Sequence, residues 1–543
     1  MRFPQSTCST RRILCVFPAY APSFGTFSHA YHLFGRVRAF MPPQGLLLIA
    51  AYMPEDWPVR FVDENIRPAS AADFAWADVV LVSGMHIQAP QIHDIGRRAK
   101  AAGKVIALGG PSVSSAPEMY PEFDYLHIGE IGDSTDRLIA RLDDSCAAPP
   151  GQVRFETGER LALSDFPVPA YHLIRLDRYL LGSLQFSSGC PYRCEFCDIP
   201  ALYGRQPRLK TPQQLTAELD AMLAQGRHPS VVYFVDDNFI GNRKATREML
   251  PHLIEWQKRR GHPLRFACEA TLNIAKQTEI LALMRAAEFH TVFVGIESAE
   301  TDALVQMRKE HNAALPMLEA IRTLNSYGLE VTSGIILGLD TDTAETEARL
   351  KAFIDASNVP ILTINLLQAL PKTPLWDRLK RDGRVIADDT GLESNVLFLR
   401  PYDEVVAMWR RCIAHAYAPE RLFQRFTHQV EATYANRLVG PAHGKLTLNN
   451  LRLALVLAFN VALRVGVLSD YRRWFWNAVL PALRRGQIDA ALSMGVVGHH
   501  LIRFSREALR GEQNASFYSA QSRHSARAAK TPRTVFAKLR KSA

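Results

Sequence analysis

Residues 187–200 read SSGCPYRCEFCDIP, and this stretch decides how the rest of the chain is interpreted. Three of the eight cysteines, Cys190, Cys194 and Cys197, fall within it, whereas the other five are scattered along 543 residues. The Cys-x3-Cys-x2-Cys spacing lets one loop wrap three thiolates around a single centre. Because the cysteines have no obvious pairing partners, the cluster indicates a metal site in a reducing compartment.

The surroundings of this loop favour an iron–sulfur cluster over zinc. Zinc sites usually use two Cys-x2-Cys pairs, or cysteines with nearby histidine, and neither is found near the loop. Three thiolates on a four-iron cluster leave one iron without a protein ligand, so that iron can bind and polarise a substrate or cofactor. The alternative to an iron–sulfur cluster is a zinc knuckle or three free thiols.

Composition excludes several classes of protein. Hydrophobic residues make up 47% of the chain and charged residues 22%, which is ordinary for a globular protein and unlike a disordered, collagen-like or polytopic membrane protein. Lysine and arginine total 64 against 54 acidic residues, giving a net charge of +10. That excess suits an anionic partner such as nucleic acid, acidic lipid or a phosphorylated cofactor. The N-terminal apolar run ends at Pro18, too short for a signal peptide, so we expect a cytoplasmic protein.

The first part of the chain alternates short apolar strands with helices. That alternation predicts an α/β fold with a parallel, doubly wound, Rossmann-like sheet. Ligands bind beyond the carboxyl ends of the strands in such sheets, and glycines there let a backbone approach a ligand closely. The strands are predicted at 12–17, 59–62, 78–83, 104–108 and 125–128, and their ends carry Ser83, Gly109, Gly110, Gly129 and Glu130.

A second alternating series follows a proline-bearing connector. Its strands are predicted at 184–187, 231–235, 264–269, 291–296, 330–337 and 361–368, and six such units in a row suit a partial barrel. The pattern then becomes helical, and a basic tail without acidic residues is expected to be disordered. The predicted organisation is a Rossmann-like domain at 1–145, a linker at 146–175, a partial barrel at 176–400, a helical domain at 401–520 and a tail at 521–543.

The cysteine loop, with aromatic Phe196 before its third cysteine, resembles the cluster loop of the radical SAM superfamily, whose fold is a six-unit partial barrel. The resemblance implies that Cys190, Cys194 and Cys197 hold a [4Fe–4S] cluster. Its open iron would chelate S-adenosylmethionine (SAM), and reduction would cleave SAM to methionine and a 5′-deoxyadenosyl radical. The protein's share of such chemistry is to position the cofactor and exclude water.

The same resemblance implies contacts to SAM at the ends of the barrel strands. Asp236 stands where the family approaches the SAM amino group, Glu269 ends the third strand, and Glu297 stands where the family often contacts the ribose. Arg308 is implied to reach the SAM carboxylate. Each carboxylate also has an ordinary alternative, as a helix N-cap or an ion-pair partner.

A Rossmann-like domain ahead of a radical SAM barrel resembles the cobalamin-binding members of that superfamily. Cobalamin domains that ligate cobalt through histidine carry Asp-x-His-x-x-Gly, but here Asn65 replaces the histidine and Pro68 the glycine. The resemblance therefore implies methylcobalamin bound without a histidine ligand. Its cradle would be formed by Asn65, Ser83, Gly109, Gly110, Gly129 and Glu130. A degenerate domain that binds nothing is the alternative.

Longer stretches narrow the resemblance to the bacterial hopanoid C-2 methylase family. They include MPPQGLLLIAAYMPEDW at 41–57, CEFCDIPALYGRQPRLKTP at 194–212 and SDYRRWFWNAVL at 469–480. The implied reaction is cobalamin-dependent radical methylation at C-2 of a hopanoid, in hopanoid biosynthesis. One SAM is the radical source, and a second SAM remethylates the cobalt. Implied partners are the hopanoid lipid and a reducing electron donor of flavodoxin or ferredoxin type.

Two alternatives stay open. One keeps the architecture but changes the outcome, to another hopanoid carbon or to oxidative ring cyclisation. The other is RNA modification, prompted by the basic charge; it is disfavoured because the basic excess lies in the tail and no nucleic-acid module is found.

A lipid substrate also predicts peripheral contact with the inner face of the cytoplasmic membrane. The apolar run 453–463, the aromatic residues 474–476 and the neighbouring arginine pairs would form that surface. A buried helical cap is its alternative.

Overall fold

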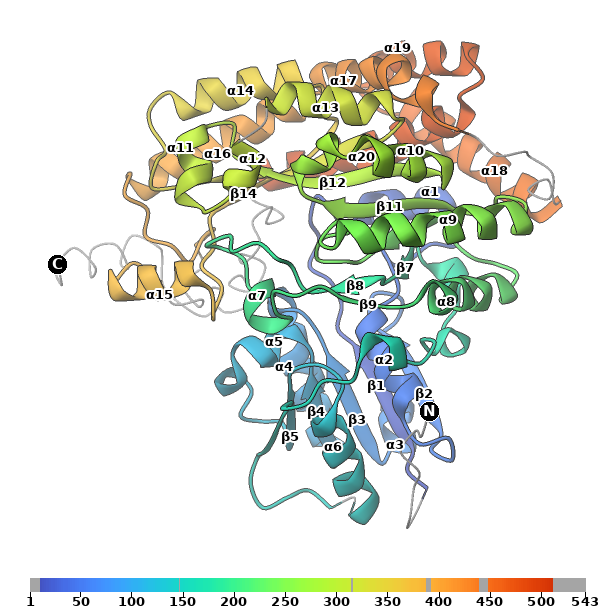
Figure 1. Cartoon of the computed structure of the whole chain (residues 1–543), viewed down its shortest axis with the longest axis vertical. Coiled ribbons are helices and arrows are strands. Elements are labelled where there is room, and N and C mark those ends of the chain that lie inside the picture. Colours follow the sequence, from blue (N-terminus) through green and yellow to red (C-terminus); the bar gives the residue numbers. More distant parts are fainter. Residues whose placement is uncertain (1–9, 146, 314–315, 387–391, 439–447, 511–543) are drawn as a thin grey trace. The chain divides into compact units, whose positions relative to one another are not determined.

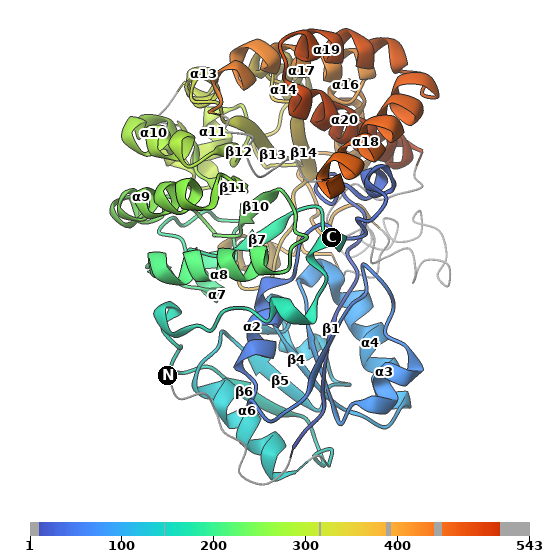
Figure 2. The same cartoon turned by 90° about the vertical axis from the view of Figure 1, so that its right-hand side faces the viewer.

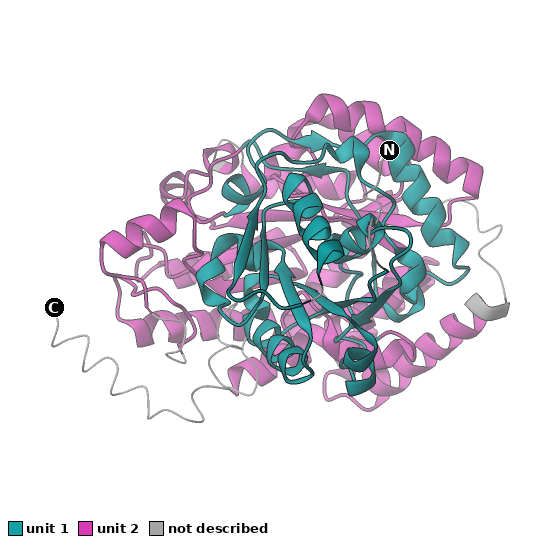
Figure 3. Ribbon diagram, turned by 90° about the horizontal axis from the view of Figure 1, so that it is seen from below, with its two compact units in different colours: residues 1–21, 38–191, 198–229 teal, residues 22–37, 192–197, 230–543 magenta. Residues whose placement is uncertain are grey.

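The computed structural model describes residues 10–145, 147–313, 316–386, 392–438 and 448–510 (Figure 1). The chain divides into two compact units (Figure 3). Unit 1 comprises residues 1–21, 38–191 and 198–229, and unit 2 comprises residues 22–37, 192–197 and 230–543. The predicted barrel strands from 231 onward and the helical region therefore share one unit, which also takes in a short segment that the sequence assigned to the first domain.

Unit 1 is built on a parallel sheet of six strands in the order β2-β1-β3-β4-β5-β6. The strands are β1 (Ile13–Phe17), β2 (Val59–Asp63), β3 (Val79–Ser83), β4 (Val105–Gly109), β5 (Tyr125–Ile128) and β6 (Val153–Glu156). All five residues of β1 are buried, as expected for a strand covered on both faces. The predicted doubly wound sheet is confirmed.

Helices cover both faces of this sheet. One buried apolar cluster joins the strands to α2 (Gln44–Tyr52) and α6 (Asp133–Asp144), and a second joins them to α3 (Ala71–Trp76) and α4 (Ala89–Ala101). Figure 2 shows the two pairs of helices on opposite sides of the strands. Because β1 lies between β2 and β3, the strand order reverses there, and the carboxyl ends of β1 and β3 flank the usual binding crevice of such sheets.

Two details differ from the prediction. The linker at 146–175 contains β6, an edge strand with Phe155 as its one buried residue, which is too weak a hydrophobic signal to recognise in the sequence. The single strand predicted at 184–187 is instead β7 (Gly182–Leu184) and β8 (Ser187–Ser188). The second of these pairs antiparallel with β9 (Arg208–Leu209), so the chain leaves the expected direction just before the cysteine loop.

Unit 2 contains consecutive parallel strands, as predicted for the barrel. They are β10 (Val231–Phe234), β11 (Arg265–Ala270), β12 (Phe289–Glu297), β13 (Glu330–Leu337) and β14 (Ile361–Leu366). The helices between them include α9 (Arg243–Arg260), α10 (Thr278–Ala286), α13 (Met317–Ser326) and α14 (Thr346–Ser357). Parallel strands end at the same edge, so side chains that follow them gather there.

The C-terminal part of unit 2 is helical, which confirms the prediction for that region. It consists of α16 (Tyr402–Ala416), α17 (Pro419–Ala432), α18 (Leu448–Val461), a π-helical turn at Ala462–Val467, α19 (Arg472–Arg484) and α20 (Ile488–Leu509). No helix among the described residues is long and apolar enough to cross a membrane. The predicted tail at 521–543 lies outside the described residues.

Candidate functional site

The cysteine loop follows β8 and runs from one unit into the other. Cys190 belongs to unit 1, Cys194 and Cys197 belong to unit 2, and all three are half-buried. Gly189 has φ +98°, and a side chain there would press against the carbonyl oxygen of Gly204. The Cys190 N–H donates to that same carbonyl at 3.2 Å. The start of the loop is therefore held tightly by unit 1 itself.

The donor set fits a [4Fe–4S] cluster better than a single ion. Among the described residues, no three His, Cys, Asp or Glu side chains gather around one ion position. A mononuclear site needs its ligands to meet at one point, whereas each thiolate of a four-iron cluster binds a different iron. Three half-buried cysteines on one short loop are a donor set of that kind.

A buried lysine lies beside the part of the loop that belongs to unit 2. The Lys309 ammonium lies 2.7 Å from Glu297 Oε1 and 5.7 Å from the ring centroid of Phe196. Burial lowers the pKa of Lys309, but Glu297 and the nearby thiols of Cys194 and Cys197 outweigh it and raise that pKa above its usual value. The lysine is thus a fixed positive charge beside two of the three predicted ligands.

The backbone of β12 explains how Glu297 reaches this lysine. The register of β12 against β13 shifts between Gly295 and Glu297, and Glu297 has φ +66°. A side chain at Gly295 would collide with the Glu297 carboxylate and with the Lys309 ammonium. A side chain there would displace the ion pair that folds back over Gly295.

The other predicted carboxylates meet at the same edge of the sheet. Tyr233 donates its hydroxyl to Glu269 Oε1 at 3.2 Å. Burial raises the pKa of Glu269 to about 7, the bond from Tyr233 opposes that shift, and the charges of Asp237, Asp236 and Glu297 add to it. The charges of Asp236 and Glu297 therefore act on Glu269, which places the three carboxylates near one another.

The predicted cation differs from the one that the structure buries. Arg308 is exposed, with φ +55°, whereas the next residue, Lys309, is 5% exposed and paired. Sequence reasoning missed Lys309. The adjacent pair of basic residues is a usable signal, but it does not say which of the two turns inward.

In unit 1, the residues predicted to cradle cobalamin make local bonds. Asn65 donates to Asp63 Oδ1 at 2.7 Å and accepts from the backbone N–H of Tyr20 at 2.8 Å. Asp63 also accepts from the Tyr179 hydroxyl at 2.9 Å. The amide of Asn65 thus ties the turn after β2 to the segment after β1.

Glu130 is bonded in the same way. Its carboxylate pairs with Arg208 and, at 3.2 Å, with Arg160, and it accepts from the Ser188 hydroxyl at 3.2 Å. The end of β5 is thereby tied to β8 and β9 within unit 1.

The glycines of this edge divide into two kinds. Gly110 and Gly129 have φ of +92° and +106°, and a side chain on either would collide with Ser83 or Thr157. The fold itself requires them. A Cβ at Gly109, in contrast, would make only ordinary contacts with His127. Its missing side chain is unexplained by packing, as expected where a ligand approaches the backbone.

Two family models match the chain. Residues 184–354 match the radical SAM superfamily, and residues 373–514 match a domain of unknown function, DUF4070. The chain is also 58% identical over 522 residues to the hopanoid C-2 methylase of Rhodopseudomonas palustris, covering 96% of this chain and 99% of that protein.

Solved structures resemble the fold at low sequence identity. The cobalamin-dependent SAM radical enzyme OxsB, determined with aqua-cobalamin, aligns with a TM-score of 0.58 at 13% identity, over 92% of this chain and 81% of that one. The radical SAM methyltransferase TsrM from Kitasatospora setae, determined with cobalamin and a [4Fe–4S] cluster, aligns with a TM-score of 0.55 at 17% identity, over 92% and 100%. These likenesses concern the architecture of the chain.

Proposed function

The chain belongs to the hopanoid C-2 methylase family, and on that premise we propose that it is a cobalamin-dependent radical SAM methyltransferase that methylates C-2 of a hopanoid. The observation that carries the proposal is 58% identity over 96% of this chain and 99% of its relative. Saturated ring carbon offers no lone pair or acidic proton to an ordinary methyl donor, so radical chemistry is the route that such a substrate requires.

Cys190, Cys194 and Cys197 are the proposed ligands of the cluster. A bound [4Fe–4S] cluster would supply the electron that cleaves SAM, and cobalamin would supply the methyl group. Lys309 keeps a positive charge beside Cys194 and Cys197, which favours their thiolate forms, the forms that bind iron.

Asp236, Glu269 and Glu297 are the proposed contacts to SAM. They lie at the carboxyl ends of β10, β11 and β12, and their mutual influence on the pKa of Glu269 supports a common site. The contact from Arg308 to the SAM carboxylate stays a prediction. The buried Lys309 is a second cation for that role, since its ammonium already lies next to Glu297.

The proposed cobalamin contacts lie at the carboxyl edge of the sheet in unit 1. Ser83 ends β3 beside the point where the strand order reverses, and Gly109 ends the neighbouring β4. The remaining members of the predicted cradle, Asn65, Gly110, Gly129 and Glu130, shape that edge through their own bonds and backbone conformations.

The decisive experiment combines anaerobic reconstitution with product analysis. The full chain, loaded with iron, sulfide and methylcobalamin, is given SAM, a strong reductant and a hopanoid. We expect 5′-deoxyadenosine and a hopanoid heavier by one methylene unit, with fragment masses that place the methyl group on ring A. A product that has lost hydrogen would favour oxidative cyclisation, and a methyl group on another carbon would change the assigned position. Turnover without RNA dismisses RNA modification.

A peripheral membrane contact is part of the proposal, because a hopanoid partitions into lipid. The side chains of Leu451, Leu455 and Phe459 are 50%, 62% and 65% exposed and lie four residues apart along α18. Val467 and Leu468, in and just after the π-helical turn, are 57% and 70% exposed. Exposed apolar side chains grouped on one segment of the chain are typical of an interaction surface.

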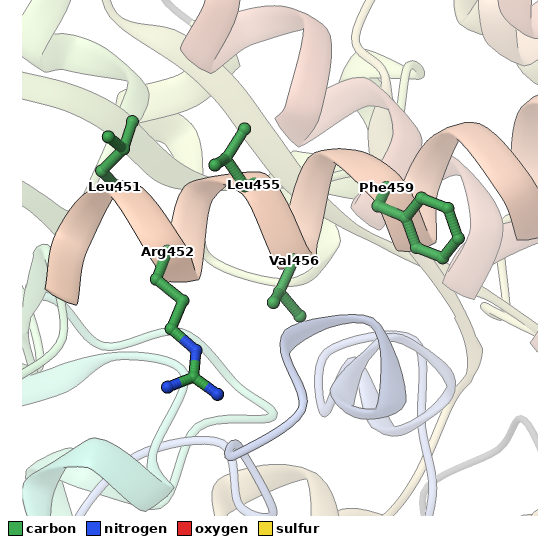
Figure 4. Close-up of a pocket in the computed structure, with 5 residues that line it drawn as sticks. All are labelled: Leu451, Arg452, Leu455, Val456 and Phe459. Carbon is green, nitrogen blue, oxygen red and sulfur yellow. The ribbon is translucent and has the colours of Figure 1, made fainter. Parts of the chain in front are cut away.

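The charge around this apolar surface favours an anionic lipid headgroup as its partner. No acidic residue occurs between Glu431 and Asp470, whereas Arg452 and Arg464 lie along the same segment. Figure 4 shows Leu451 and Leu455 on one side of α18 and Arg452 on the other. These side chains are among those that line a shallow hollow of about 380 Å³. Basic residues near an anionic surface contribute about 1 kcal/mol each. Phe475 of α19 is buried, so it does not belong to the exposed apolar surface, although the sequence analysis included it there.

Vesicle flotation at low salt tests this contact. With phosphatidylglycerol vesicles, Phe459→Asp should weaken binding about tenfold, because it removes buried apolar area and adds a repelled charge. Leu399→Asp is the matched control, since Leu399 is 67% exposed but lies outside α18. Equal binding by both variants, or binding of the wild type to neutral vesicles alone, would contradict the contact.

A further inference from the structure

A chain of four alternating charges in unit 2 includes a residue of the cysteine loop. Glu195, which lies between Cys194 and Phe196, is 8% exposed. Arg378 on α15 (Pro374–Arg381) donates from Nε to Glu195 Oε1 at 2.7 Å and from Nη2 to Oε2 at 3.1 Å. Two parallel bonds from one guanidinium fix the orientation of a carboxylate as well as its distance.

The backbone of Glu195 is held at the same place. Its N–H donates to the carbonyl of Met307 at 2.9 Å, and its carbonyl accepts from the N–H of Leu375 at 3.0 Å. Leu375 and Arg378 both belong to α15, whose first turn is capped by the Thr373 side chain. One helix therefore binds the main chain and the side chain of the residue next to a cluster ligand.

The far side of Arg378 is anchored to the barrel. Its Nη1 donates to Asp340 Oδ2 at 2.8 Å, and Asp340 also accepts from Arg384 Nη2 at 2.6 Å. Asp340 follows β13. Burial would raise the pKa of Asp340, but the bonds from Arg384 and Arg378 outweigh it and keep that carboxylate ionised. The arginine thus has no freedom to turn away from Glu195.

The charges of Glu195 and Arg378 would also affect a cluster bound to the neighbouring cysteines, in addition to their role in packing. Without Arg378, the negative charge of Glu195 would stand uncompensated one residue from Cys194. A negative charge next to a cluster makes it harder to reduce, and loss of an outer hydrogen-bond partner loosens a metal ligand.

We infer that Arg378 is a positioning residue for the reaction: through Glu195 it sets the geometry of the cysteine loop and neutralises the charge beside Cys194. The inference rests on the proposed function, in that the three cysteines hold a [4Fe–4S] cluster. Its mark is a change in cluster retention and midpoint potential larger than the loss of stability in the cluster-free chain explains, because removing Arg378 also leaves the buried Glu195 unpaired.

The test uses the full chain, reconstituted anaerobically, with Arg378→Gln, Arg378→Lys and Arg381→Gln. Arg381 lies on the same helix but is exposed, so its variant is the matched control. We expect Arg378→Gln to lose iron to a chelator about tenfold faster than wild type and to show an altered electron paramagnetic resonance signal and a lower midpoint potential. Arg378→Lys should be intermediate, because it keeps the charge but not the paired bonds.

The double variant Glu195→Gln/Arg378→Gln separates charge from geometry. It should recover the midpoint potential, because no net charge is left, but not the slow loss of iron. A wild-type spectrum, potential and rate of iron loss in Arg378→Gln would overturn the inference. So would iron loss from Arg378→Gln and Arg378→Lys that only follows the fall in the melting temperatures of the cluster-free variants. If the wild type itself binds no iron–sulfur cluster, the proposed function fails instead.

Discussion

The carboxyl edges of the two parallel sheets carry predicted site residues, but those residues behave differently. In unit 2, Glu297 lies close enough to Glu269 to help raise the pKa of Glu269, and Glu297 is joined to Lys309. In unit 1, Asn65 and Glu130 are bonded to their own surroundings. Topology brings strand ends together in both sheets. Which of these side chains can contact a ligand depends on their hydrogen-bond and ion-pair partners.

The largest expected effect comes from removing the two cysteines of the loop that belong to unit 2. Cys194→Ala/Cys197→Ala should contain no iron–sulfur cluster and form no 5′-deoxyadenosine above background, because one thiolate cannot retain the cluster. Iron and sulfide content and deoxyadenosine by chromatography measure this. Cys268→Ala is the control, since Cys268 is buried in β11 and should leave iron binding intact. Iron retained by the double variant would refute the ligand assignment.

The next largest effect comes from removing the ion pair between Lys309 and Glu297. Lys309→Met leaves Glu297 buried without its partner, which should lower the free energy of unfolding by about 3 kcal/mol. Urea denaturation of the cluster-free chain measures it. Adding Glu297→Gln should restore part of the loss, because the unpaired charge is removed. A loss below about 1 kcal/mol would mean that water reaches Glu297.

A third effect concerns pH. Glu269 has a pKa of about 7 in the folded chain against an ordinary 4.5, so the folded state binds the extra proton between these values. Stability should therefore fall as pH rises from 4.5 to 7, by roughly 3 kcal/mol. The facing groups are Tyr233, Asp236, Asp237 and Glu297. Glu269→Gln should flatten this part of the stability curve, and an unchanged slope would assign it to another group.

The smallest effect sharpens the contrast with unit 1. Glu130→Gln should lower the free energy of unfolding by about 1 kcal/mol, since its pairs with Arg208 and Arg160 are only partly buried, and should leave cobalamin retention unchanged. Gly109→Ala should do the reverse, with weaker cobalamin retention at nearly unchanged stability. Absorbance of protein-bound cobalamin after gel filtration distinguishes the two variants. Loss of cobalamin from Glu130→Gln would mean that the Glu130 carboxylate does contact cobalamin.

Much of the fold could be predicted because its signals are local. Strands with buried apolar runs, such as β1 and β13, lie where the sequence placed them. The strands that were missed have weak local signals: β6 buries one side chain, and β7 and β8 are three and two residues long. The spacing of the cysteines was enough to indicate the chemistry, because the three predicted ligands lie within eight residues of one another in the sequence.

By itself, the sequence determined the two parallel sheets, the helical C-terminal region and the three neighbouring thiols. Only the tertiary structure decided which charges pair: that Lys309 rather than Arg308 is buried, that Glu130 meets Arg208, 78 residues away, and that Arg378 reaches Glu195 across 183 residues. The physical reason is the distance along the sequence over which each kind of interaction acts. Hydrophobic periodicity is written in neighbouring residues, whereas a buried charge must find its partner wherever the folded chain brings one.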